Sequence, residues 1–372
     1  MTIACLSTNG TNHFNLAAPV KTLYIATISG VETIERRDDG TWKKVAHTLE
    51  GSHISAMTLA AATGKVFAAA MPGTVMASSD GARTWHASGQ GITEKGAYSL
   101  RCYEGSNGAS VLYAGAQPVA LYRSADGGAS WTDLASVRTA PLHETWRFPA
   151  PGHEPHLKTL AVDPRHPEVI YAGVEQGALL KSIDGGASWR DLDQFVDYEN
   201  FVYKDIHQIV LRPSNADEVY ITTGLGIYHS TDNGETWSQL TSSDFRIGYP
   251  DQLLFAPDDD RKLFVSGGFA IPYYWVEAKT AKGTVMVSDD GGKNWRPPRG
   301  GFPESRANVE AMSMCAYPGG YEIFAGTTDG EVFVSADGGE TWSPIVREMA
   351  AISKPTHDTL INGLAYANDL KP

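Results

Sequence analysis

The sequence is poor in cysteine, in basic runs and in long hydrophobic stretches. Its three cysteines, Cys5, Cys102 and Cys315, lie far apart without a CxxC pair, so we expect buried thiols rather than a disulfide or zinc framework. The 30 Lys and Arg are outnumbered by 43 Asp and Glu, and the net charge of −13 is spread along the chain. This charge disfavours a nucleic-acid partner. No stretch approaches the ~18 apolar residues of a membrane-spanning helix, which disfavours a membrane partner.

Several functional motifs are also missing. The N-terminus shows no basic region followed by an apolar run, so we expect no secretory signal and a cytoplasmic protein. The chain contains no P-loop, GxGxxG, GxSxG or HExxH motif. These absences disfavour nucleotide-binding, dinucleotide-binding, serine-hydrolase and zincin functions.

What the sequence does have is a repeat. Six copies of an eight-residue phrase of the form Ser-x-Asp-x-Gly-x-x-Trp, the first with Ala for its Gly, occur at Ser78–Trp85, Ser124–Trp131, Ser182–Trp189, Ser230–Trp237, Ser288–Trp295 and Ser335–Trp342. A seventh, shortened copy ends at Trp42. A recurring phrase of this kind predicts a recurring structural unit, as in a propeller or a solenoid. Because the repeat runs nearly end to end, we expect one domain over residues 1–372.

Each unit reads as four short strands. Between the phrases the chain cycles through apolar or alternating runs bounded by Gly, Pro, Asp or Asn, for example Leu160–Pro164, Val169–Gly173, Ala178–Ser182 and Trp189–Leu192. Four strands make one propeller blade, and seven copies predict seven blades. The Asp and Gly of each phrase suit a tight turn between the third and fourth strands. The Trp is expected to pack between neighbouring blades.

The repeated phrase is the Asp-box, and the chain resembles the Asp-box (BNR) repeat proteins. This superfamily includes sialidases, sortilin-type receptors and photosystem-assembly-factor-like propellers. The resemblance implies an all-β fold, a seven-bladed β-propeller of four-stranded antiparallel blades. It implies little about function, because the box is a structural device on the face away from the usual ligand site.

The two termini are predicted to share one blade and so close the ring. The run Leu360–Tyr366 matches the first strand of a blade whose other strands are Thr22–Ala26, Val31–Ile34 and Trp42–Val45. Such closure leaves no open sheet edge. First strands are expected to start near His53, Tyr98, His156, Asp205, Asp251, Glu310 and His357.

The longest connections are predicted on one face, opposite the Asp-boxes. They are Arg138–Pro155, Asp193–Lys204 and Phe269–Gly283, the last with the aromatic stretch Pro272–Glu277. Long aromatic loops commonly wall a pocket, although they can also be plain surface loops. The candidate substrate-binding residues on this face are Trp146, Arg147, Tyr273, Tyr274, Trp275, Lys158 and Arg101.

Histidines and carboxylates gather at the starts of the first strands. The imidazoles are candidate ligands for Zn, Fe, Mn or Cu, from His53, His156, His207 and His357. Without a metal, a general acid and base could come from His156, His207, Asp205, Asp251, Glu310 and Glu175. The alternative is a wet channel whose polar residues only bind water or cap backbone groups.

Two functions of different classes follow from these residues. The first is an enzyme of hydrolase or lyase type, acting on a small organic molecule or glycan fragment in an axial pocket, with or without a divalent metal. The second is a non-catalytic protein-interaction or assembly scaffold. A true sialidase is disfavoured, because the nearest phrases to its Arg-Ile-Pro signature, at Trp146–Pro149 and Phe245–Gly248, do not precede the first box, and no convincing arginine triad is present.

Overall fold

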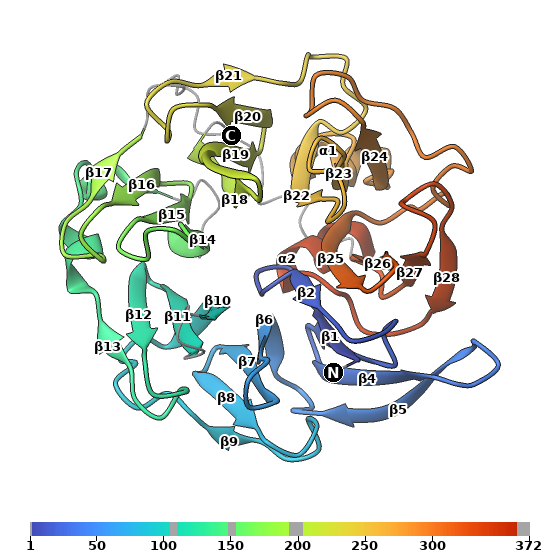
Figure 1. The fold of residues 1–372 in the computed structure, drawn as a ribbon, viewed down its shortest axis with the longest axis horizontal. Helices are drawn as coiled ribbons and strands as arrows, with labels where there is room; N and C mark the ends of the chain where they lie inside the picture. Colours follow the sequence, from blue (N-terminus) through green and yellow to red (C-terminus); the bar gives the residue numbers. More distant parts are fainter. Residues whose placement is uncertain (1, 105–109, 148–153, 193–203, 363–372) are drawn as a thin grey trace.

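Seven β-sheets stand like blades around a central axis (Figure 1). The computed structural model describes residues 2–104, 110–147, 154–192 and 204–362. Five sheets are four-stranded, one has three strands and one has five. The expected all-β, seven-bladed propeller is confirmed.

The fourth blade shows the repeating unit. Its strands are β14 (His156–Val162), β15 (Ile170–Glu175), β16 (Ala178–Ser182) and β17 (Arg190–Asp191), paired antiparallel in sequence order. These strands fall on the four predicted runs of that unit. Three more blades repeat this order. The second blade contains β6 (His53–Ala60), β7 (Lys65–Met71), β8 (Val75–Ser78) and β9 (His86–Ala87), and the third contains β10 (Gly96–Glu104), β11 (Ser110–Gln117), β12 (Ala120–Ser124) and β13 (Thr132–Asp133). The fifth contains β18 (Ile206–Arg212), β19 (Asn215–Thr223), β20 (Gly226–Ser230) and β21 (Ser238–Gln239).

The sixth blade is reduced. It contains β22 (Tyr249–Phe255), β23 (Leu263–Gly268) and β24 (Thr284–Ser288), and a single bridge between Val287 and Arg296 replaces its outer strand. A helix, α1 (Pro272–Ala278), lies between β23 and β24, where the sequence suggested only a loop.

The ring closes through both termini, but with other strands than expected. The first blade takes its inner strand from the N-terminus: β1 (Ile3–Leu6) pairs parallel with β3 (Thr22–Thr27), followed by β4 (Gly30–Arg36) and β5 (Trp42–Thr48). The last blade, with β25 (Val309–Tyr317), β26 (Gly320–Thr327), β27 (Val332–Ser335) and β28 (Ser343–Val346), adds the N-terminal β2 (His13–Asn15) parallel to β25. One sheet therefore contains strands from both ends of the chain.

The predicted C-terminal strand is a helix where it can be described. Residues Pro355–Asn362 form α2, so the prediction of a first strand near His357 and from Leu360 was wrong. Two physical reasons apply. The inner position of the first blade is already filled by β1, and Pro355 suits the first position of a helix. The rest of the predicted run, residues 363–366, lies outside the described residues.

Each Asp-box forms the same small hydrogen-bonded turn. In the first box, Asp80 Oδ1 accepts hydrogen bonds from Ser78 Oγ at 2.8 Å and from the Thr84 amide at 2.9 Å, and Oδ2 accepts one from Thr84 Oγ1 at 2.6 Å. The shortened copy keeps part of the pattern, because the Thr41 amide donates to Asp39 Oδ1 at 2.9 Å. The box tryptophan then reaches the neighbouring blade, where Trp85 Nε1 donates to Thr48 Oγ1 at 3.0 Å.

The hydrophobic core is divided among the contacts between neighbouring blades. The cluster containing Phe67, Leu100 and Tyr122, for example, joins the second and third blades, and all three side chains are fully buried. Cys5 and Cys315 are buried in the cluster that joins the first and last blades, and all three cysteines of the chain are unpaired. Among the described residues, no helix is long and apolar enough to cross a membrane.

The N-terminal segment between β1 and β2 crosses the axis of the ring. Thr11 donates its amide hydrogen to Met57 O of β6 at 3.1 Å, and Asn9 O accepts the Leu100 amide of β10 at 3.2 Å. On the other side, Gln252 Nε2 of β22 donates to Thr8 O at 2.8 Å. The segment thus ties together inner strands of distant blades and fills this level of the channel.

Candidate functional site

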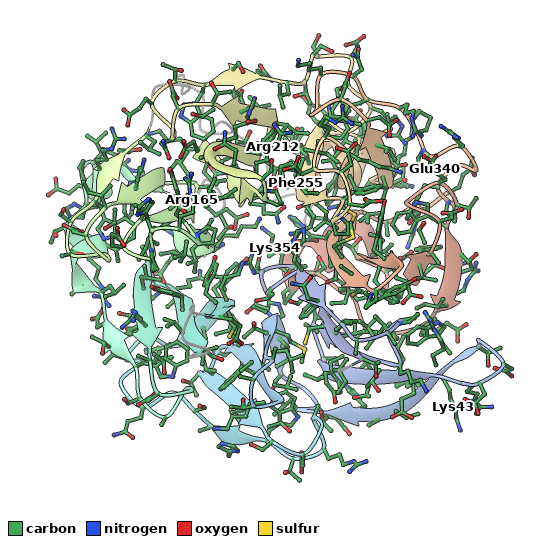
Figure 2. The ribbon with its side chains drawn as sticks, in the orientation of Figure 1. Lys43, Arg165, Arg212, Phe255, Glu340 and Lys354 are labelled. Carbon is green, nitrogen blue, oxygen red and sulfur yellow. The ribbon has the colours of Figure 1, made fainter. Side chains whose placement is uncertain are left out.

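The inner strands begin at one end of the axis, on the face opposite the Asp-boxes, which we call the loop face. There, five strands and the segment before α2 bring titratable side chains together, and Lys354 lies near the middle of the ring (Figure 2). The six predicted acid–base residues all lie in this group and are at most 5% exposed. We define the axial cluster as His156, Lys158, Glu175, Asp205, His207, Asp251, Glu310, Lys354 and His357.

Glu175 is the centre of the axial cluster. Its Oε1 accepts hydrogen bonds from Lys158 Nζ at 2.7 Å and from Lys354 Nζ at 2.6 Å, and its Oε2 lies against His156 Nε2. Burial by itself raises the pKa of Glu175, but the charges of Lys158 and Lys354 hold it well below the ordinary value. The pKa of Lys354 is lowered by burial, yet the Glu175 carboxylate raises it well above normal. The three groups therefore form a buried ionic network.

Asp205 and His207 form a second pair beside Glu175, to which Asp205 is joined by a backbone bridge. His207 Nε2 lies 3.2 Å from Asp205 Oδ2, which also accepts a hydrogen bond from Tyr249 OH at 3.1 Å. Burial raises the pKa of Asp205, but the His207 charge outweighs burial and lowers it. His207 Nδ1 lies 2.7 Å from Pro250 O, so this nitrogen carries the hydrogen and donates it.

Asp251 and Glu310 are the remaining carboxylates of the axial cluster. Glu310 Oε2 accepts hydrogen bonds from Ser353 Oγ and from His357 Nδ1, the latter at 3.0 Å. Burial opposes ionisation of Glu310, but the His357 charge lowers its pKa to about 2. Asp251 accepts a hydrogen bond from Asn308 Nδ2 at 2.7 Å. Burial, reinforced by the charge of Glu310, nevertheless raises the pKa of Asp251 to about 7.

The four predicted histidine ligands are not brought together as one set. His53 is half-buried at the start of β6, and His357 belongs to α2 rather than to a strand. Instead, Glu175, Asp205 and His207 each offer an oxygen or nitrogen within 4.8 Å of the others, and these three buried residues could hold a metal ion. Sequence spacing alone did not single out this trio.

The predicted substrate-binding residues separate into covered and exposed positions. Trp275 of α1 is fully buried, its ring centre lies 5.1 Å from that of His357, and its Nε1 donates to Ala270 O at 2.6 Å. Tyr273 and Tyr274 on the same helix are 46% and 49% exposed. Thus α1 covers the axial cluster with one aromatic side chain and presents two others to solvent.

The other substrate-binding candidates lie apart from one another. Lys158 belongs to the axial cluster, Trp146 is half-buried and Arg147 is exposed. Arg101 lies well along β10 and not on the loop face, because its guanidinium donates to Gly10 O of the crossing N-terminal segment. Most of the Asp193–Lys204 connection lies outside the described residues.

A groove of about 650 Å³ opens beside the axial cluster on the loop face. We call it the mouth groove and define it by its lining residues His53, Met71, Pro72, Thr93, Glu94, Lys95, Gly96, Tyr98, Gln117, Pro118, Glu154, His156, Lys354, Pro355 and Thr356. Sequence reasoning missed it. The available signal was the X-Pro pair that follows the second strand in two consecutive repeats, Met71-Pro72 and Gln117-Pro118.

These features define a closed Asp-box propeller with a filled channel and a groove at one mouth. Two family models match the chain: the model described as Sortilin, neurotensin receptor 3, over residues 177–316, and the BNR/Asp-box repeat over residues 333–344. The resemblance to Asp-box repeat propellers is confirmed by these matches and by the fold.

Known proteins of similar sequence or structure serve different functions. A xyloglucanase from Paenibacillus sp is 26% identical over 114 residues, which make up 26% of this chain and 11% of that protein. Two YCF48 structures align with this chain. The one bound to D1 peptide is 14% identical with a TM-score of 0.58, and the alignment covers 89% of this chain and 94% of that one. The one from Cyanidioschyzon merolae is 14% identical with a TM-score of 0.51, and the alignment covers 82% of this chain and 88% of that one. An ancestral GH74 enzyme aligns at 18% identity and TM-score 0.54, over 77% of this chain and 37% of its own. At these identities the structural likeness establishes the fold alone.

Proposed function

We propose that this protein is a non-catalytic binding scaffold that holds an extended segment of a partner protein in the mouth groove. The observation that carries the proposal is the contrast between the groove, which is open, and the axial cluster beside it, which is covered. A ligand on the loop face meets the groove first. His156 and Lys354 of the axial cluster line the groove, whereas its four carboxylates do not.

The coverage of the axial cluster argues against direct catalysis by it. A general acid or base must come within about 2.6–3.2 Å of the substrate proton, directly or through one water. Glu175 is 0% exposed, and its two oxygens already face Lys158, Lys354 and His156. Glu310 is 3% exposed and is engaged by Ser353 and His357. Neither carboxylate lines the mouth groove, so a substrate bound there does not contact their oxygens.

The lining of the groove suits a peptide better than a glycan chain to be hydrolysed. Its rim carries three exposed prolines, Pro72, Pro118 and Pro355, beside Met71 and the buried Tyr98. Apolar walls with a few polar groups are typical of binding pockets of about 300–1,000 Å³.

Glycoside hydrolysis, by contrast, needs two carboxyl groups flanking the scissile bond. The groove lining includes two carboxylate residues, Glu94 and Glu154, and Glu94 is already paired with Arg138 Nη2 at 3.2 Å. A peptide bound to a YCF48 propeller of the same fold supports the peptide proposal by analogy.

The experiment is a selection of random peptides displayed on phage against the full chain. We expect enriched peptides to lose at least about tenfold in affinity for Thr356→Trp and Gln117→Arg, which change the groove by bulk and by charge. The matched control is Ser343→Trp, an exposed position beside the box tryptophan Trp342, where binding should be unchanged.

Two outcomes would count against the scaffold. If the enriched peptides bind the unmodified chain and its three variants equally, their binding site lies outside the mouth groove. Hydrolysis of xyloglucan oligosaccharides by the unmodified chain, lost in Glu175→Gln, would favour the enzyme instead.

A further inference from the structure

Independently of any peptide, we infer that the axial cluster contains a binding site for a divalent metal ion, with Glu175, Asp205 and His207 as ligands and Zn²⁺ as the preferred ion. The site would join the end of β15 to the start of β18. Through Glu175 it would also be linked to Lys354 and the C-terminal segment.

The geometry of the three residues is compact and dry. Their ligand atoms all lie within 4.8 Å of one another, and the residues are 0%, 5% and 2% exposed. Zinc binds carboxylate oxygen and imidazole nitrogen at about 2.0–2.2 Å, so donors around one ion lie about 3–4 Å apart. Small movements of side chains are enough to close the set on an ion.

The tautomer of His207 points to a cation. Because His207 Nδ1 donates to Pro250 O at 2.7 Å, Nε2 is the ring nitrogen left to face Asp205, and it carries a proton in the charged ring and a lone pair when a metal ion binds there. This nitrogen faces the Asp205 carboxylate, with 3.2 Å between Nε2 and Oδ2. Two electron-rich atoms at this distance repel unless a proton or a metal ion lies between them. A backbone carbonyl behind the second ring nitrogen is also the usual support of a metal-binding histidine.

Unsatisfied atoms favour the metal ion over the proton. Within the described part of the chain, His207 Nε2 and Asp205 Oδ1 have no hydrogen-bond partner although both are buried. Buried polar atoms nearly always have a hydrogen-bond or metal partner, so two neighbouring atoms without one indicate that both bind the same absent partner. An imidazolium would give Nε2 a proton to donate but would leave Asp205 Oδ1 unsatisfied.

The charges of the axial cluster accommodate a cation. Lys158 and Lys354 both bind Glu175 Oε1 and leave Oε2 on the other side of the carboxylate. The cluster holds four carboxyl groups against these two lysines. His156 lies beside this trio but is not part of it: its Nε2 faces Glu175 Oε2, and its Nδ1 lies 3.0 Å from Glu154 O.

The chemistry of the donors selects among metals. Two carboxylate oxygens and imidazole nitrogen, without thiolate, suit Zn²⁺, Mn²⁺ or Fe²⁺ rather than a soft ion such as Cu⁺. Among these three ions, the imidazole ligand and the general order of divalent-metal affinities favour Zn²⁺.

The test is metal binding by the full chain, without any peptide. After treatment with a chelator and dialysis, the protein is given ZnCl₂, and metal content is measured by mass spectrometry together with the melting temperature. We expect about one Zn²⁺ per chain and a higher melting temperature. His207→Gln and Asp205→Asn should weaken binding by at least about tenfold.

The matched control is His229→Gln. His229 also faces a carboxylate, with Nε2 3.1 Å from Glu218 Oε2, but it lies outside the axial cluster. This variant should bind Zn²⁺ as the unmodified chain does.

Failure is equally measurable and does not depend on the variants folding. If the unmodified chain retains less than about a tenth of an equivalent of Zn²⁺, Mn²⁺ or Fe²⁺, and Co²⁺ gives no ligand-field spectrum, the inference is wrong. Zn²⁺ binding that persists unchanged in a folded His207→Gln protein would also overturn it. Neither result bears on the peptide proposal, because that proposal is tested separately by peptide binding to the mouth groove.

Discussion

The two faces of this propeller use the same chemical group in opposite ways. On the Asp-box face, each carboxylate is near the surface and is held by hydroxyl and amide donors of its own turn, as at Asp126, whose pKa falls to about 2 because Ser130 and Ser124 donate to it. In the axial cluster, carboxylates are buried and depend on lysines and histidines of other strands, such as Lys158 of β14, and of the segment before α2, such as Lys354. The first arrangement is local and repeats. The second is assembled from distant parts of the chain and occurs once.

Among the substitutions that test this contrast between the two faces, the largest loss of stability is expected at Glu175. Glu175→Gln leaves Lys158 and Lys354 buried without a counter-charge, and loss of one partner of a buried pair costs about 3–5 kcal/mol. We expect urea denaturation to show a loss of that size and proteolysis to reach the C-terminal segment. Glu304→Gln, an exposed carboxylate on a loop, is the control and should change stability by less than about 0.5 kcal/mol. A Glu175→Gln protein as stable as the control would mean that the ionic network does not hold the segment.

A pH-dependent effect is expected at Asp251. Its pKa of about 7 in the folded protein is raised by burial and by Glu310, whereas the unfolded chain ionises near 4. The folded state therefore keeps the proton between these values, and this contribution to stability is present below about pH 4 and is lost as the pH rises through 7.

Asp251→Asn removes that titration. The variant should gain on the order of 1–3 kcal/mol relative to the unmodified chain between pH 5 and pH 8. Denaturation at both pH values measures it, with the exposed Asp258→Asn as the charge-matched control. An identical pH profile for both variants would show that Asp251 is ionised in the folded state.

The smallest effect is expected in a single Asp-box. Asp337 accepts hydrogen bonds from Ser335, Thr341 and the Glu340 amide, all within its own turn. Asp337→Ala should cost about 1–2 kcal/mol, as for other side chains that cap backbone amides.

The shortened copy offers the matching comparison, because Asp39 accepts hydrogen bonds only from Thr41 among the described residues. Asp39→Ala should lower the melting temperature less than Asp337→Ala does. A larger loss at Asp39 would mean that the box stabilises the blades through something other than these hydrogen bonds.

Most of the blade architecture was predictable, because its causes are local. Turn residues, strand alternation and the box tryptophan recur within each unit, so six of the seven predicted first strands begin within two residues of the expected position. The failure at His357 has a tertiary cause. Whether a short apolar run becomes a strand depends on a vacant sheet edge, and β1 had already taken that edge.

The axial cluster was predictable in membership but not in arrangement. His207, Asp251 and Glu310 lie at the bulge of their inner strands, and His156 and Asp205 lie two residues before it, so their convergence follows from the ring. The position of Lys354 does not, because Lys354 precedes α2, and its bond to Glu175 joins residues far apart in the sequence. No period could have indicated that the carboxylates of the axial cluster would be covered.

The sequence by itself determined the number of blades, the position of the Asp-box turns and the end of the axis where titratable residues gather, since each depends on interactions within one repeat. Only the tertiary structure decided which ends close the ring, what fills the channel, and that the axial cluster is buried beside an open mouth groove. Those outcomes depend on which segments compete for the same space, and such competition is settled only when the whole chain has packed.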